Sequence, residues 1–219
     1  MNKNLNIKSL VIDKPLKLDC GQTINNFPLA YETYGSLNEK KDNAILVFHA
    51  LTGDQFVSGV NPITNKDGWW SYAVGSGKAL DTDKYFVICA NVISGCLGSF
   101  GPSNINPKTN KIYGTDFPII TINDMVNAQY NLLDFFKIEK LFGVMGGSMG
   151  GMQVLQFVSN FPNKAKIAIP IACTSSHSAQ NIAFNELGRQ SIMADTNWLN
   201  GDYANQNKNP DKGLSVARM

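Results

Sequence analysis

The fold of this 219-residue chain is decided by residues 141–151, which read LFGVMGGSMGG. The run begins with apolar residues typical of a strand covered on both faces, and a helical pattern follows over residues 152–158. Between strand and helix lies the pattern Gly-x-Ser-x-Gly, centred on Ser148. Its two outer glycines let strand and helix approach closely while the serine takes a strained backbone conformation. This stretch therefore predicts a turn that lifts the Ser148 hydroxyl above the carboxyl edge of a sheet, where it can act as a nucleophile.

Three other apolar runs have the same character as the strand before Ser148. They span residues 44–48, 85–90 and 165–171. A helical pattern over residues 122–136, capped by Thr121 or Asn123, lies between two of these runs. Strands that alternate with helices predict an α/β fold with a mostly parallel sheet.

Two parts of the chain depart from this alternation. Residues 16–34 alternate apolar and polar side chains around turn-forming residues, which predicts an antiparallel hairpin. After about residue 174 the sequence becomes polar and helix-rich, with frequent Asn and Gly. We therefore expect a partial α/β core over residues 1–174 and a partial helical lid over residues 175–219.

The composition argues against several functional classes. Lys and Arg number 19 against 17 Asp and Glu, a net charge of +2, and their scatter argues against nucleic-acid binding. No run reaches the roughly 18–20 apolar residues of a spanning helix, and the N-terminus has no secretory apolar segment, so we expect a cytoplasmic protein without a membrane partner. Two histidines and no C-x-x-C pair argue against a metal site. The cysteines are interpreted as free thiols: Cys20, Cys89, Cys96 and Cys173.

A serine hydroxyl is a poor nucleophile unless a base and an oxyanion pocket assist it. One backbone donor of such a pocket is the N–H after the nucleophile, which here belongs to Met149. The second comes from the loop after an earlier strand, where Leu51 would supply it. We interpret His49, at the end of that strand, as a residue that hydrogen-bonds the backbone. The glycine-rich residues 91–101 do not spell G-x-G-x-x-G, so no nucleotide site is expected there.

Four stretches resemble the homoserine O-acetyltransferase family, a branch of the α/β-hydrolase fold that serves methionine biosynthesis. They read LAYETYGSLN at residues 29–38, HALTG at residues 49–53, GGSMGGMQ at residues 146–153 and GLSVARM at residues 213–219. The segments at residues 91–96, 101–103 and 188–190 also follow the family pattern. The resemblance therefore runs nearly from end to end of the chain.

The resemblance implies an α/β-hydrolase fold and a ping-pong acyl transfer. Ser148 would take an acetyl group from acetyl-CoA and pass it to the γ-hydroxyl of L-homoserine, with no cofactor beyond that co-substrate. Arg218 would grip the carboxylate of homoserine, a role that suits the paired donors of a guanidinium. The complete enzyme is implied to be a homodimer.

The chain departs from the family where the catalytic acid and base should follow. The triad order on this fold is Ser, then Asp or Glu, then His, and the last two lie beyond the lid. After Ser148 the one histidine is His177, and the aspartates that follow it give the reverse order: Asp195, Asp202 and Asp211. We interpret His177 as an ordinary polar residue. We therefore expect this chain to be a fragment that lacks the C-terminal strands and the catalytic Asp and His. By itself, the fragment is expected to show no catalytic turnover.

Three alternatives stay open at this level. A succinyl donor could replace acetyl-CoA, and no residue decides between the two. An esterase of the same fold would differ only in that water removes the acyl group from Ser148. The absence of an evident acid and base leaves a third alternative, an inactive binding domain.

Overall fold

The computed structural model describes residues 7–219. The expectation that the N-terminus has no secretory segment rests partly on residues 1–6, which lie outside the described residues. The described chain divides into two units. The first contains residues up to Phe100 together with Ile119–Thr174, and the second contains Gly101–Pro118 and Ser175–Met219. Each unit is described by itself.

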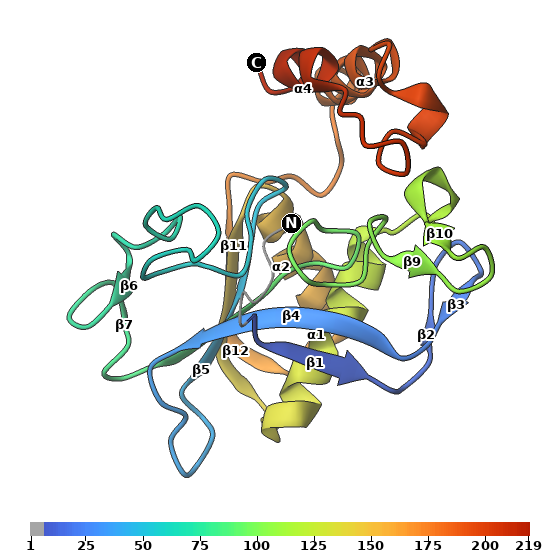
Figure 1. The fold of residues 1–219 in the computed structure, drawn as a ribbon. Helices are drawn as coiled ribbons and strands as arrows, with labels where there is room; N and C mark the ends of the chain where they lie inside the picture. Colours follow the sequence, from blue (N-terminus) through green and yellow to red (C-terminus); the bar gives the residue numbers. More distant parts are fainter. Residues whose placement is uncertain (1–6) are drawn as a thin grey trace. The chain divides into compact units, whose positions relative to one another are not determined.

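A six-stranded sheet forms the centre of the first unit (Figure 1). Its spatial order is β1 (Ser9–Ile12), β4 (Phe27–Tyr34), β8 (Phe86–Ala90), β5 (Ala44–Phe48), β11 (Leu141–Gly147) and β12 (Ala165–Ile171). The last four strands are parallel, whereas β1 and β4 are antiparallel to their neighbours. The predicted α/β fold with a mostly parallel sheet is therefore confirmed.

The antiparallel hairpin expected over residues 16–34 is shorter than the alternating pattern. Only β2 (Leu16–Lys17) and β3 (Thr23–Ile24) form it. Strand β4, which follows, instead pairs with both β1 and β8 in the main sheet. Alternation identifies a half-buried strand but does not identify its partner, because any neighbour can bury the same face. The first unit also contains the short pair β6 (Val74–Gly75) and β7 (Leu80–Asp81).

Two helices connect the parallel strands. Helix α1 (Ile122–Phe136) begins at a capping box, in which the Thr121 hydroxyl accepts from the Asp124 N–H and the Asp124 carboxylate accepts from the Thr121 N–H. Thr121, rather than Asn123, is therefore the cap. Helix α2 (Met149–Asn160) begins immediately after Ser148 and packs against β5, β11 and β12. It ends before Pro162, as the sequence predicts.

The parallel sheet carries apolar side chains on both faces. Leu46 and Phe48 of β5 join the core beneath α1 and α2, whereas Ile45 and Val47 of the same strand join a second cluster that includes Trp69. Strands β5 and β8 are buried along their whole length, as their continuous apolar runs predict.

Strand β12 differs from the other parallel strands because it is the edge of the described sheet. Its isoleucines stay partly exposed, with Ile167 and Ile169 each 45% exposed and Ile171 37% exposed. Its apolar sequence alone predicts burial on both faces. In the described part of the chain, however, only β11 pairs with it.

The second unit contains the helical segment that the sequence places after residue 174. Its helices are α3 (Ala179–Met193) and α4 (Asp211–Ala217), which pack against each other, with the short helix η2 (Leu199–Gly201) between them. Residues 101–118 belong to the same unit and contain β9 (Ile105–Asn106), β10 (Lys111–Ile112) and η1 (Gly114–Asp116). None of the helices within residues 7–219 is long and apolar enough to cross a membrane.

Candidate active site

Ser148 lies in the turn between β11 and α2 with φ 56° and ψ −122°. A side chain in this left-handed region costs free energy, and such strain is found where a functional residue must be held in a fixed place. The Ser148 N–H donates to the Ile171 carbonyl oxygen at 3.0 Å, so the neighbouring strand β12 holds the turn in place. The serine itself is exposed. The strained strand–turn–helix geometry expected from Gly-x-Ser-x-Gly is therefore present.

The two outer glycines are required by close packing. A Cβ atom on Gly146 would lie 2.6 Å from the carbonyl oxygens of Phe48 and Gly150. A Cβ atom on Gly150 would overlap the Phe48 carbonyl and lie 3.1 Å from the His49 carbonyl oxygen. Helix α2 can therefore start beside the end of β5 only because no side chain intervenes at these two positions.

Two backbone N–H groups next to the turn are candidates for an oxyanion pocket. Strands β5 and β11 are parallel, with Phe48 in register with Gly146, so the segment with Leu51 and the segment with Met149 leave the sheet at the same edge. Met149 is the first residue of α2, where a helix leaves its N–H groups without an intrahelical partner. Within residues 7–219, neither the Leu51 N–H nor the Met149 N–H donates to another protein group.

His49 follows β5 and is 2% exposed. Its Nδ1 lies 2.7 Å from the Ala50 carbonyl oxygen, and its Nε2 accepts from the Val92 N–H at 3.1 Å. Burial lowers the pKa of the His49 imidazole, and the Ala50 carbonyl and the Asp54 charge oppose this only in part. Both ring nitrogens are thus occupied by backbone groups, as the sequence interpretation of His49 expects.

Gln153, in the first turns of α2, links the segment before Leu51 to the start of α2 at Met149. Its Nε2 lies 3.3 Å from the His49 carbonyl oxygen and 3.4 Å from the Met149 carbonyl oxygen. Its Oε1 accepts from Gln129 of α1 at 2.7 Å, which sets the orientation of the Gln153 amide. Both glutamines are completely buried. Sequence reasoning missed this pair, although polar residues on the buried faces of two amphipathic helices are a signal that could have found it.

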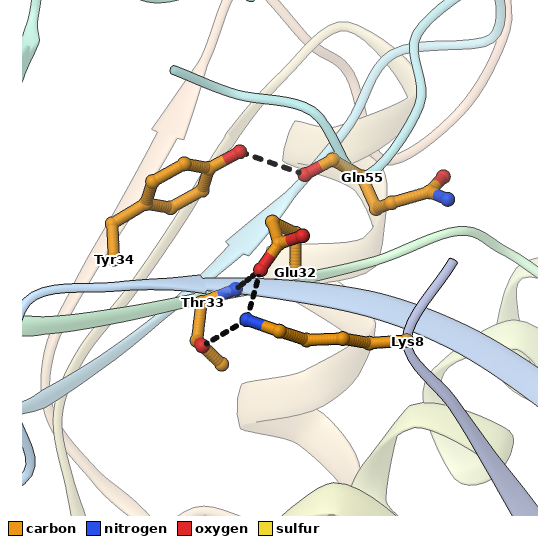
Figure 2. A network of polar contacts seen from close by, with 5 residues as sticks. All are labelled: Lys8, Glu32, Thr33, Tyr34 and Gln55. Atoms are coloured by element: carbon orange, nitrogen blue, oxygen red, sulfur yellow. Dashed lines mark hydrogen bonds and ion pairs between the residues drawn. The ribbon is translucent and has the colours of Figure 1, made fainter. Parts of the chain in front are cut away.

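The strand that carries the ETY sequence supports the loop after Leu51 (Figure 2). Tyr34 donates from its hydroxyl to the Gln55 carbonyl oxygen at 3.4 Å, and burial raises the pKa of the Tyr34 phenol. The Glu32 carboxylate accepts hydrogen bonds from the Lys8 ammonium and from the Thr33 N–H, which Figure 2 also shows. In the described chain, Glu32 and Tyr34 of the family-like stretch at residues 29–38 therefore hold neighbouring segments in place.

His49 is the one histidine among the described residues of the first unit, and both of its ring nitrogens bond backbone groups, so no histidine there is free to act as a base for Ser148. His177 belongs to the second unit and lies exposed in the segment before α3. Asp195 accepts from the Asn197 and Gly213 N–H groups, and these bonds lower the pKa of its carboxyl. It therefore ties the end of α3 to the start of α4.

The other candidate site residues of the second unit, Arg218, Asp202 and Asp211, lie at different places in that unit. Arg218 is exposed at the C-terminal end of α4. Asp202 accepts from the side chains of Asn205 and Gln206, which lower the pKa of its carboxyl, and Asp211 lies in the first turn of α4. Among residues 7–219, no group of three or more His, Cys, Asp or Glu side chains could hold a metal ion. All four cysteines are free thiols.

A serine on a strained strand–helix turn, at the carboxyl edge of a mostly parallel sheet, defines the class of protein. The family model of the alpha/beta hydrolase fold matches residues 43–218, and the chain belongs to this family. The chain is 84% identical over its whole length to the homoserine O-acetyltransferase of Pelagibacter ubique (strain HTCC1062), of which it covers 59%. It is 58% identical over 94% of its length to the homoserine O-acetyltransferase of Bradyrhizobium diazoefficiens, of which it covers 52%. The chain thus spans a little over half the length of these relatives.

Two solved structures have the same fold. The crystal structure of homoserine O-acetyltransferase from Bacillus anthracis matches with a TM-score of 0.88 at 30% identity, over 96% of this chain and 57% of that one. The crystal structure of esterase E22 matches with a TM-score of 0.86 at 32% identity, over 97% of this chain and 59% of that one.

Proposed function

We propose that this chain belongs to a homoserine O-acetyltransferase, which transfers an acetyl group from acetyl-CoA to the γ-hydroxyl of L-homoserine in methionine biosynthesis. The observation that carries the proposal is Ser148, held at φ 56° at the sheet edge where the segments with the free N–H groups of Leu51 and Met149 also leave the sheet. The 84% identity to an acetyltransferase of that name supports the choice of substrates.

The reaction has two halves that use the same atoms. The Ser148 hydroxyl loses its proton to a base and attacks the thioester carbonyl of acetyl-CoA, and the thiolate of CoA leaves with a proton. The homoserine hydroxyl then attacks the ester on Ser148 and restores the serine. Each half passes through a tetrahedral oxyanion, which the Leu51 and Met149 N–H groups would stabilise. In the proposed enzyme the base and its acid partner come from residues outside the first unit.

Five further assignments complete the proposal: the homoserine-binding residue, the co-substrate, the lid, the location and the oligomeric state. Arg218 binds the carboxylate of homoserine, and acetyl-CoA serves as co-substrate without a further cofactor. The helical segment Ser175–Met219 of the second unit acts as the lid. The whole enzyme works in the cytoplasm. It acts as a homodimer, and sedimentation of the whole protein would test this oligomeric state.

Substitution of Ser148 by alanine tests the nucleophile. The host is a whole protein in which these 219 residues replace the matching stretch of the Pelagibacter ubique relative. Mixing this protein with acetyl-CoA should add the mass of one acetyl group to Ser148, and Ser148→Ala should abolish both the adduct and the turnover. Ser159→Ala, on the exposed side of α2, is the matched control and should keep both. An adduct that persists in Ser148→Ala and maps to another residue would overturn the assignment.

A hydrolytic esterase is the second candidate, because esterase E22 has the same fold at 32% identity. The two functions differ in which molecule removes the acetyl group from Ser148. With homoserine present, a transferase yields O-acetylhomoserine in excess over acetate. Acetate as the main product at saturating homoserine would favour the esterase.

A further inference from the structure

We propose that His49 is a positioning residue that orients the Leu51 N–H through the peptide bond between Ala50 and Leu51. The inference rests on the proposed function, since Leu51 acts as an oxyanion donor only in acyl transfer. It assigns His49 no proton transfer and no contact with the substrate.

The geometry of one peptide unit carries the argument. The Ala50 carbonyl oxygen accepts from His49 Nδ1 at 2.7 Å and from the Gly53 N–H at 2.9 Å. This carbonyl and the Leu51 N–H belong to the same planar trans peptide, so they point in opposite directions. A bond that holds the Ala50 oxygen on the protein side therefore aims the Leu51 N–H away from it. The Leu51 side chain is 70% exposed, so its own packing does little to fix this orientation.

The orientation of the imidazole is set by groups outside the loop. The Val92 N–H can only donate, so His49 Nε2 must accept, and the single ring proton of the neutral imidazole is on Nδ1. Val92 follows β8, and the His49 carbonyl is held in turn by Gln153 of α2. A chain of hydrogen bonds therefore runs from the loop after β8, through the ring, to the peptide that presents the Leu51 N–H.

Two substitutions separate the two ends of the imidazole. The Nδ2 atom of asparagine takes the place of Nδ1, so His49→Asn keeps the bond to the Ala50 oxygen and loses the bond from Val92. The Oε1 atom of glutamine takes the place of Nε2, so His49→Gln keeps the bond from Val92 and loses the bond to Ala50. Each variant therefore loses one hydrogen bond of the buried ring, but only glutamine loses the side-chain bond to the Ala50 oxygen, which then keeps the Gly53 N–H alone as its partner.

The variants are compared in the whole protein used to test Ser148. We expect His49→Gln to lower kcat by about 10²-fold, the scale of losing one oxyanion donor, with the KM values for acetyl-CoA and homoserine unchanged. Both half-reactions should slow equally, because both pass through the oxyanion. His49→Asn should stay within about tenfold of the parent, although its Tm falls as far as that of the glutamine variant.

A second measurement needs no turnover. The residual dipolar coupling of the Leu51 N–H, in protein labelled with ¹⁵N-leucine, reports the orientation of that bond. It should match the parent in His49→Asn and differ in His49→Gln. Equal couplings in both variants, or kcat values that fall together with Tm in both, would overturn the role of His49. A parent protein that forms no acetyl adduct on Ser148 would instead refute the proposed function, and the dipolar couplings would still decide whether His49 orients the peptide.

Discussion

At the scale of single residues, His49 should make the stability of the protein depend on pH. Burial lowers the pKa of this imidazole below its ordinary value of about 6.5, whereas in the unfolded chain the ring titrates normally. Below about pH 6.5 the unfolded state therefore binds a proton that the native state does not. The stabilisation by the neutral ring is complete above that pH and is lost as the pH falls towards the native pKa.

Urea unfolding of the whole protein at pH 7, 6 and 5 checks this pH dependence. The free energy of unfolding should fall by up to about 1.4 kcal/mol per pH unit more in the parent than in His49→Asn, which cannot titrate at this position. His177→Asn, which removes an exposed histidine, should behave as the parent does. An identical pH dependence in the parent and His49→Asn would contradict the buried neutral imidazole.

Arg218 provides a second test at the residue scale. If its guanidinium binds the homoserine carboxylate, Arg218→Ala should lower kcat/KM for homoserine by roughly 30-fold or more and leave the rate of acetyl transfer to Ser148 unchanged. Arg218→Lys should recover only part of the loss, because an ammonium lacks the paired donors. Lys212→Ala, which removes another exposed cation of α4, is the control. Equal loss in the acetylation step would assign Arg218 a different role.

At the scale of elements, the approach of α2 to β5 limits which residues the turn accepts. A Cβ atom at Gly150 would overlap the Phe48 carbonyl, whereas one at Gly147 would meet nothing within 4 Å. Gly150→Ala should therefore lower the free energy of unfolding by about 1–3 kcal/mol, the usual cost of overpacking. Gly147→Ala should change it by less than about 1 kcal/mol. Thermal unfolding of the two variants compares them directly, and equal Tm values would show that the helix can move aside.

At the scale of the whole molecule, strand β12 determines how the 219-residue chain should behave in solution when it is produced by itself. Its partly exposed isoleucines form the edge of the described sheet, and an apolar edge strand pairs readily with another chain. The 219-residue polypeptide by itself should therefore self-associate in sedimentation velocity and show no turnover. Ile169→Lys should reduce that association, since a charge on an edge strand opposes pairing. A monomeric 219-residue chain with turnover near that of the whole protein would contradict this expectation and would show that a base lies within these residues.

The sequence by itself determined those features that depend on neighbouring residues. Continuous apolar runs identified the parallel strands, helical spacing identified α1, and Gly-x-Ser-x-Gly between a strand and a helix identified the strained turn at Ser148. These patterns are readable because strand and helix periods, and the need for glycine at a close approach, act over a few positions of the chain.

Only the tertiary structure decided the features that join distant segments. It paired β4 with β1 and β8, left β12 at the sheet edge, and brought Val92 to the ring and Gln153 to the carbonyl of His49. Such contacts depend on which strands become neighbours. Hydrogen bonds from an imidazole or an amide can reach many backbone groups, so the sequence showed that His49 needed partners but not which ones they were. The physical reason is that burial obliges a polar side chain to find partners, whereas the arrangement of the sheet chooses them.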